Sequence, residues 1–120
     1  MTTIKEKVNY LNAEILKGNI LGAFEELYDD NITMQENNET PRVGKDANRE
    51  YETNFVNSIE EFHGAEILSV NVNEENGTAA VESFMDVTLK GYGRVARTQV
   101  AVQKWENGKI ISERFYYSNN

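Results

Sequence analysis

Glu113 is the acid of this sequence that stands out for its surroundings, because the C-terminal segment around it otherwise reads as apolar. A carboxylate buried without a partner is energetically unfavourable. An inward Glu113 would therefore have a functional role or a partner, with Gln99, Gln103 or Arg97 as the candidates. The alternative is an outward glutamate, solvated and paired across a sheet. Partial burial raises the pKa of a carboxyl group, which suits it to proton transfer.

The sequence lacks the residues that most other kinds of catalytic or metal site require. The sequence has no cysteine, which excludes disulfides, thiolate metal sites and a cysteine nucleophile. His63 is the only histidine, so a histidine metal cluster is excluded, and the acids show no recognisable ligand spacing. We interpret His63 as the C-terminal cap of a helix. Gly91-Tyr92-Gly93 connects two extended segments and precedes no helix, so it does not resemble a phosphate loop. We therefore expect neither a metal nor a cofactor.

The chain is strongly acidic, with a net charge of −8 over 120 residues. Its twelve lysines and arginines are scattered instead of forming a stripe, which disfavours binding to nucleic acid. No segment approaches the roughly 20 apolar residues of a membrane span, and the N-terminus lacks the apolar core of a signal peptide. We expect one soluble, cytoplasmic domain over residues 1–120, without membrane or nucleic-acid partners.

Apolar residues at helical spacing predict three helices in the first half of the chain. The first has its apolar positions at Ile4, Val8, Leu11 and Ile15, and Gly18-Asn19 closes it. The second stripe runs from Ile20 to Tyr28, and a short strand is predicted from Ile32 to Glu36. The third helix has Asp46 as its expected N-cap and ends at His63-Gly64. Its apolar positions are Ala47, Tyr51, Phe55, Ile59 and Phe62.

Beyond residue 64 the apolar period changes from 3.6 to 2, which predicts strands. The predicted strands are Ala65–Asn73, Thr78–Lys90, Arg94–Glu106 and Lys109–Ser118. Short connectors make consecutive strands antiparallel neighbours, and Asn107-Gly108 is the pair expected in a type I′ turn. Helices followed by a meander of strands predict an α+β domain, in which three N-terminal helices pack on a strongly curved, mostly antiparallel sheet.

The order and spacing of these elements resemble the nuclear transport factor 2-like superfamily, in particular its SnoaL-like and ketosteroid-isomerase-like branch. The resemblance covers essentially the whole chain. It rests on Lys17-Gly18-Asn19-Ile20, Leu27 to Met34, Gly44-Lys45-Asp46-Ala47 and Trp105 to Ile110. It implies a single SnoaL-like domain with a cone-shaped, cystatin-like fold. The superfamily includes isomerases, cyclases, dehydratases, epoxide hydrolases and non-enzymatic binding proteins, so the resemblance leaves the reaction open.

Strand alternation indicates which side chains would face the cavity of such a fold. With Trp105 pointing inward, its strand would present Gln103, Ala101, Gln99 and Arg97 on the same face. The last strand would present Glu113, Phe115 and Tyr117, and the strand Thr78–Lys90 would present Val81, Ser83, Met85, Val87 and Leu89. The opposite register is the alternative for each strand. The candidate ligand-binding residues are Tyr51, Gln99, Gln103, Trp105, Phe115 and Tyr117.

The resemblance also points to Glu36, which falls where isomerases of the superfamily carry their general base. We take Glu36 and Glu113 as the candidate catalytic residues. The alternative is that Glu36 is one more solvated acid in a polar stretch. Leu11 and Ala101 stand where the isomerases have their oxyanion donors, so steroid isomerisation as such is not expected. Ser118 stands where SnoaL-like relatives often have an acid, which disfavours a cyclase-like mechanism.

Three functions follow from these observations. The first is a carboxylate-based isomerase, lyase or cyclase acting on a small, largely apolar organic molecule. The second is a non-catalytic ligand-binding or accessory domain with the same pocket. The third is an interaction protein whose sheet is a dimer surface and whose cavity is filled core. We also expect a homodimer through the outer face of the sheet, because Phe84, Val100 and Val102 lie on the face that the helices cannot cover.

Overall fold

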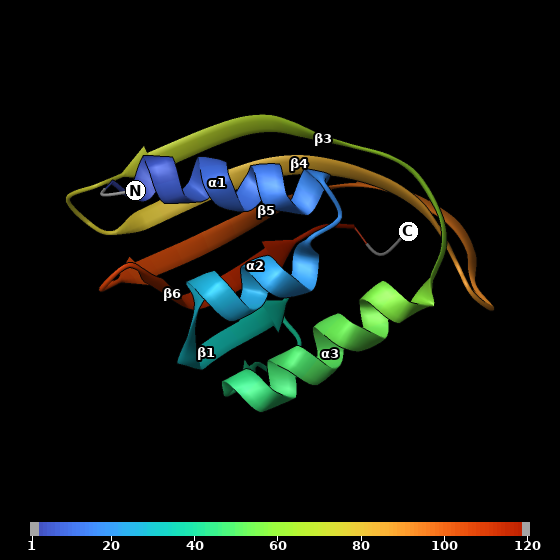
Figure 1. The fold of residues 1–120 in the computed structure, drawn as a ribbon, viewed down its shortest axis with the longest axis horizontal. Coiled ribbons are helices and arrows are strands. Elements are labelled where there is room, and N and C mark those ends of the chain that lie inside the picture. The colour runs from blue at the N-terminus through green and yellow to red at the C-terminus, as the bar shows by residue number, and fades with distance from the viewer. Residues whose placement is uncertain (1–2, 119–120) are drawn as a thin grey trace.

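Three helices lie on the concave face of a curled, six-stranded sheet in this computed structural model, which describes residues 3–118 (Figure 1). The helices are α1 (Ile4–Leu16), α2 (Ile20–Leu27) and α3 (Lys45–Ser58). The strands are β1 (Tyr28–Glu36), β2 (Arg42–Val43), β3 (Ile59–Asn73), β4 (Thr78–Leu89), β5 (Gly93–Glu106) and β6 (Lys109–Tyr116). The predicted α+β class is confirmed.

The order of strands in the sheet is β2-β1-β6-β5-β4-β3, so the four long strands form the predicted meander. All neighbouring pairs are antiparallel except β1 and β6, which run parallel. In Figure 1, β3 arches above α1 and β4 runs behind it, while α2 and α3 lie beside β1. Within residues 3–118, no helix combines the length and the apolar character that crossing a membrane requires.

The start of α1 is fixed by its own sequence and by a distant turn. Thr3 and Glu6 form a capping box. The carboxylate of Glu74, in the β3–β4 turn, accepts hydrogen bonds from the backbone N–H groups of Ile4 and Lys5 at 2.9 and 3.0 Å. A negative charge there is also favourable to the helix dipole. The first helix is therefore attached to the tip of a hairpin that lies about 70 residues away in the sequence.

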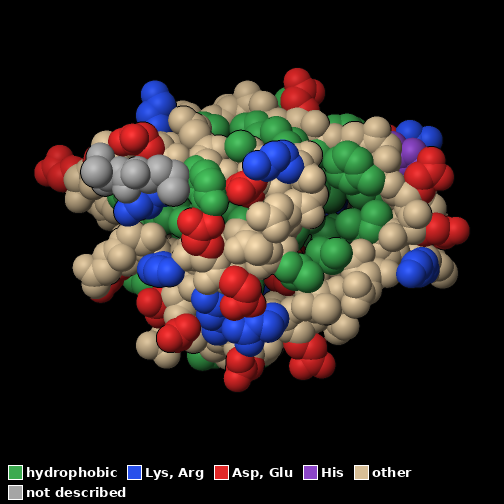
Figure 2. Space-filling view, in the orientation of Figure 1, with side chains coloured by type: hydrophobic (Ala, Val, Ile, Leu, Met, Phe, Trp, Pro, Cys, Tyr) green, Lys and Arg blue, Asp and Glu red, His purple; other side chains and the backbone are tan. Residues whose placement is uncertain are grey.

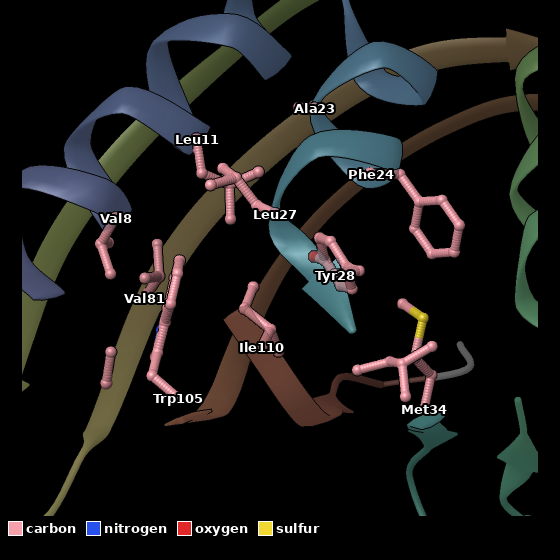
Figure 3. Close-up of a cluster of buried hydrophobic side chains, with 12 residues drawn as sticks. Val8, Leu11, Ala23, Phe24, Leu27, Tyr28, Met34, Val81, Trp105 and Ile110 are labelled. Carbon is pink, nitrogen blue, oxygen red and sulfur yellow. The ribbon is translucent and has the colours of Figure 1, made fainter. Parts of the chain in front are cut away.

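The core lies between α1, α2 and the inner face of the sheet (Figure 3). Trp105 is 5% exposed and packs with this cluster. The alternation predicted for β5 is confirmed, because Ala101, Gln103 and Trp105 are buried while the residues between them are exposed. The predicted turn is confirmed as well, since Gly108 and the residue before it both have positive φ values, 79° and 52°.

The helix α3 ends earlier than predicted. Its last residue is Ser58, and the next residues belong to β3, so the predicted end at His63-Gly64 is wrong. Apolar residues at positions 55, 59 and 62 fit a helical period. However, Ile59 and Phe62 pair with residues of β4, and this pairing gives them backbone hydrogen bonds and cross-strand contacts that a helix end lacks.

Both predicted caps of this helix are also wrong. Gly44, with φ at 95°, takes the N-cap position in place of Asp46, which lies in the first turn of the helix. His63 lies within β3 and caps no helix. Its Nε2 atom is 2.7 Å from the Oγ1 atom of Thr88 on the neighbouring strand. The histidine therefore joins two strands.

The first strand is longer than predicted. It begins at Tyr28 and not at Ile32, and the polar residues 29–31 continue it. The register between β1 and β6 shifts within this polar stretch, which indicates a β-bulge. The loop predicted after β1 contains β2, a two-residue strand that pairs antiparallel with β1. Both differences bring residues into the site described next.

Candidate functional site

A cavity of about 880 Å³ lies between the helices and the inner face of the sheet. Its apolar wall includes Leu11, Ile15, Phe24, Phe55, Val81, Met85, Val87, Leu89 and Ala101. Its polar wall includes Glu36, Glu52, Arg97, Gln99, Gln103 and Glu113. In the space-filling view, apolar side chains are visible between the helices and the arch of β3 (Figure 2).

Glu113 is buried on this wall, with 3% of its surface exposed. The Tyr28 hydroxyl donates to one carboxylate oxygen at 2.5 Å, and the Gln103 amide donates to the other at 2.8 Å. The indole N–H of Trp105 donates to the Gln103 amide oxygen at 3.0 Å, which turns the amide nitrogen toward Glu113. Burial raises the pKa of Glu113 to about 7; the two donors oppose this effect, and the charge of Glu36 adds to it.

Strand pairing places this hydrogen-bonded chain. Gln103 and Glu113 lie directly opposite each other in the β5–β6 pair. Trp105 is two residues beyond Gln103 on the same strand, so both side chains project to the inner face. Tyr28 is the first residue of β1, which runs beside β6. A slip of one residue in the register would turn these side chains to the outer face of the sheet.

Glu36 lies at the end of β1 and is 8% exposed. Arg42 donates to one of its oxygens at 3.0 Å, and the Tyr117 hydroxyl donates to the other at 2.9 Å. Arg42 is itself held in place, because its Nε donates to Asn48 at 3.1 Å and its guanidinium lies 3.6 Å from the centre of the Tyr51 ring. Glu36 is therefore an ion-paired residue of the cavity wall, and the alternative of a solvated acid does not hold.

Glu52, which the sequence analysis missed, is a third carboxylate on the cavity wall. It comes from α3, is partly buried, and has no hydrogen-bond or ion-pair partner within residues 3–118. Burial raises the pKa of Glu52 to about 7; the charges of Glu113 and Glu36 also raise it, while Arg42 lowers it.

One pattern in the sequence does point to Glu52. Asn48, Glu52 and Phe55 are four and three residues apart, so they share one face of α3. Asn48 is fully buried and donates to the backbone oxygens of β2 and of Gly44 at 3.0 and 2.8 Å. Phe55 lines the cavity. The face of α3 that turns toward the sheet is therefore marked by an amide and an acid as well as by apolar residues.

Two arginines lie around Glu36, while Arg94, which also lines the cavity, is paired with Asp86. Arg97 comes from β5, and its guanidinium lies 4.0 Å from the centre of the Tyr117 ring. The hydroxyl of the same tyrosine is bound to Glu36, whose other oxygen is bound to Arg42. Glu36 thus has one guanidinium in contact and a second across an aromatic ring. Within residues 3–118, neither Glu52 nor Glu113 contacts a cation.

Most of the residues predicted for the site lie on the cavity wall. They are the two candidate catalytic acids, Glu36 and Glu113, and four candidate ligand-binding residues, Tyr51, Gln99, Gln103 and Phe115. The other two, Trp105 and Tyr117, are not among the residues that line the cavity. Trp105 is a core residue that orients Gln103, and Tyr117 holds Glu36. Tyr117 was expected to face the same cavity as Glu113. It instead supports Glu36 from outside the cavity lining.

Comparison with known proteins gives two levels of likeness. The SnoaL-like domain family matches residues 3–117. The crystal structure of a Mesorhizobium loti protein named as a SnoaL-like polyketide cyclase superposes with a TM-score of 0.84 at 32% identity, over 97% of this chain and 100% of that chain. None of the curated proteins matches the sequence.

Two more distant structures share the fold. SalBIII, an epoxide hydrolase/cyclase-like enzyme named for pyran ring formation in the polyether salinomycin, has a TM-score of 0.79 at 23% identity, over 96% of this chain and 90% of that one. A Catenulispora acidiphila protein with a ketosteroid-isomerase-like fold, crystallised with trimethylamine, has a TM-score of 0.76 at 19% identity, over 98% and 88% of the two chains. At these identities the likeness concerns the fold alone.

Proposed function

The chain belongs to the SnoaL-like family, and from this premise we propose that it is an acid–base enzyme, an isomerase, lyase or cyclase, that acts on a small, largely apolar organic molecule. One observation carries the proposal. Glu113 is a buried carboxylate with a pKa of about 7 on the wall of a cavity of about 880 Å³. A carboxyl group with this pKa can take up and return a proton at neutral pH.

The surroundings of Glu113 suit it to the role of a general base. Its ionised form is held by Tyr28 and Gln103, so one orientation of the carboxylate is favoured before a substrate arrives. Burial and the charge of Glu113 raise the pKa of Tyr28 well above its usual value, so the tyrosine keeps its proton and remains a donor. The apolar wall beside it limits the access of water to the carbon that loses a proton.

Proton transfer by Glu113 fits the three named reaction types. Removal of a proton next to a carbonyl group gives an enolate, whose electron pair rests on the carbonyl oxygen. Return of the proton to another carbon is isomerisation, loss of a leaving group is elimination, and attack on a second carbonyl closes a ring. The developing oxygen charge needs a donor. The amide of Gln99 is available, since it lies on the wall and has no hydrogen-bond partner within residues 3–118.

A second candidate function is ligand binding without catalysis. It is favoured by Leu11 and Ala101, which line the cavity as apolar residues at the positions where isomerase relatives carry donors. The cavity would then hold its ligand through apolar contacts and a few hydrogen bonds. Mass spectrometry of small molecules that copurify with the protein would identify a candidate ligand under either function.

The enzymatic proposal is tested with 2-tetralone, a flat apolar ketone with acidic α-protons. Proton NMR in D₂O measures the exchange of these protons for deuterium. We expect the protein to accelerate exchange, and Glu113→Gln to reduce the acceleration by about 100-fold or more, since an amide is not a general base. Glu106→Gln, which changes an exposed acid at the end of β5, is the control and should exchange like the wild type. Exchange at the buffer rate from pH 5 to 9 would favour the binding function.

A further inference from the structure

We propose that the ligand of this cavity is an organic cation, an apolar molecule that carries one ammonium group, and that Glu52 is its counter-ion. This inference rests on the proposed function only in that both place a small molecule in the same cavity. It adds the chemical class of that molecule. It follows from the way charge is distributed over the cavity wall.

Four acids lie on the wall; Glu66 is exposed, and the other three differ in what neutralises them. Glu36 has Arg42 in contact at 3.0 Å and Arg97 across the ring of Tyr117. Glu113 has two neutral donors, which hold its orientation without supplying positive charge. Glu52 has neither a cation nor a donor within residues 3–118. A partly buried carboxylate that lacks every kind of partner is the place on the wall where positive charge from a ligand would be most strongly stabilised.

The protein offers no replacement for that missing charge. Arg42 lowers the pKa of Glu52 only from a distance, because its own hydrogen bonds go to Glu36 and Asn48. Among the described residues, no three acidic or histidine side chains come together in a way that could hold a metal ion. A cation that meets Glu52 would therefore be bound by one carboxylate and by apolar surface, and this combination suits an organic ammonium group.

Aromatic residues share the cavity wall with Glu52. Tyr51 and Phe55 flank it on α3, and all three residues line the cavity. Arg42 already covers one face of the Tyr51 ring, so Phe55 is the ring of α3 that is left for a ligand. Tyr28 lies near as well, since the charge of Glu52 contributes to the raised pKa of that tyrosine. Ring faces attract cations, and they stabilise an ammonium group that has lost part of its water. One carboxylate beside several rings is therefore a suitable setting for an alkylammonium group.

Binding of such a cation is coupled to pH. The pKa of Glu52 is about 7 in the empty cavity, so the group is about half protonated at pH 7. A bound ammonium group lowers this pKa and expels the proton. The titratable and charged groups that face Glu52 come from β1, β2, α3 and β6; they are Tyr28, Glu36, Arg42, Tyr51 and Glu113. The cation should therefore bind more tightly at pH 8 than at pH 6.

The test compares phenyltrimethylammonium with tert-butylbenzene, its uncharged carbon isostere. NMR titration of the cavity-lining methyl groups measures both dissociation constants, below the solubility limit of the hydrocarbon. At pH 8 we expect the wild type to prefer the cation by about tenfold, and Glu52→Gln to lose this preference while the hydrocarbon still binds. Glu50→Gln is the control; it changes an exposed glutamate of the same helix and should keep the preference for the cation.

A second measurement separates ion pairing from altered packing. Calorimetry in two buffers of different ionisation enthalpy measures the protons released on binding. The wild type should release about half a proton per bound cation at pH 7, and Glu52→Gln should release clearly less.

The inference is overturned if the wild type binds both compounds equally, if Glu52→Gln keeps the preference, or if the cation does not bind at millimolar concentration. The exchange of 2-tetralone is a separate observation. Exchange without a cation preference would remove this inference and leave the proposed function in place. A preference for the cation without exchange of 2-tetralone would support this inference and contradict the proposed function.

Discussion

Glu52 and Glu113 reach a pKa of about 7 in different settings. Glu113 is fixed by Tyr28 and Gln103, which donate to the two oxygens of its ionised form. Glu52 has no such donors, and the charge of Glu113 is part of what raises its pKa. A proton gained or lost by Glu113 therefore changes the pKa of Glu52, and the two residues titrate as a coupled pair. The fixed acid is suited to proton transfer, and the unpartnered acid is suited to binding charge.

The raised pKa of Glu113 predicts a pH-dependent stability. Because the folded pKa, about 7, lies above the usual glutamate value of 4.5, the folded state binds the proton more tightly than the unfolded chain. Stability from this group is complete below pH 4.5 and is lost as the pH rises through 7. We expect the wild type to lose up to about 3 kcal/mol more than Glu113→Gln between pH 5 and 8.

Urea unfolding at several pH values measures this difference. Glu106→Gln removes an exposed acid and should follow the wild-type curve. Parallel curves for the wild type and Glu113→Gln would show that burial does not raise the pKa of Glu113.

At the scale of residues, the sequence predicts which side chains of a strand face inward better than it predicts which side chains of a helix are buried. With Trp105 taken as inward, alternation put Gln103 on the inner face and offered an inward Glu113 as one of two alternatives; both residues are buried. Glu52 was missed because a glutamate on a polar helix looks like any solvated acid. Its burial depends on elements that pack against α3, chiefly β1, and not on its neighbours along the helix. Local spacing groups Glu52 with Asn48 and Phe55 on one face of α3, but it does not say that this face turns toward the sheet.

At the scale of elements, the turn between β3 and β4 supports the site from outside. The oxygen of Gly77 accepts a hydrogen bond from the backbone N–H of Trp105 at 2.7 Å. Trp105 in turn orients Gln103, which holds Glu113. The same turn contains Glu74, which accepts hydrogen bonds from the start of α1. A tight turn therefore joins the first helix to the acid of the cavity.

We expect Gly77→Ala to destabilise the protein by about 2–4 kcal/mol. Gly77 has φ at 72°, and an added Cβ would lie 2.8 Å from the backbone oxygen of Trp105. Gly91→Ala is the matched control, because Gly91 also has φ at 72° but has open space around an added Cβ. Thermal unfolding of Gly91→Ala measures the cost of backbone strain alone. Thermal unfolding of Gly77→Ala measures that strain together with the contact against Trp105. Equal losses would show that the contact with Trp105 contributes nothing, and tryptophan fluorescence should change in the first variant alone.

The elements that were predicted incorrectly share one cause. The end of α3 and the start of β1 both lie where the chain passes from helix to strand without a glycine or proline. Sequence patterns mark such a boundary weakly, and the partner strand decides it. The two-residue strand β2 has no period at all, so only its pairing with β1 defines it. The Asn107-Gly108 turn was predicted correctly because backbone conformation there is set locally.

At the scale of the whole molecule, the outer face of the sheet stays uncovered in a single chain. Leu68, Val102 and Tyr116 are 44%, 40% and 43% exposed. Val102 alternates with buried residues of β5, so it lies on the face opposite the helices, where Val100 was also expected. Phe84 was expected there too, but it is half-buried and is among the residues that line the cavity. We propose that a second copy of the chain covers this face, because its exposed apolar side chains would otherwise stay in contact with water.

Val102→Glu should convert such a dimer into a monomer and lower its melting temperature, since it places a charge at an apolar contact. Val43→Glu introduces the same change at a residue that is 70% exposed on the edge strand β2, and it should leave the dimer intact. Sedimentation velocity at micromolar concentration measures both. A wild-type protein that sediments as a monomer would contradict the proposed dimer.

The position of β6 between β1 and β5 also has a consequence for synthesis on the ribosome. β1 is complete at residue 36, but its parallel partner begins at residue 109. Until β6 emerges, the nascent chain has two incomplete pieces, a helical part with β1 and β2, and a three-stranded meander. Pairing over such a separation is slow. The strand that joins the pieces also carries Glu113, so the cavity obtains this acid in the same step that closes the sheet.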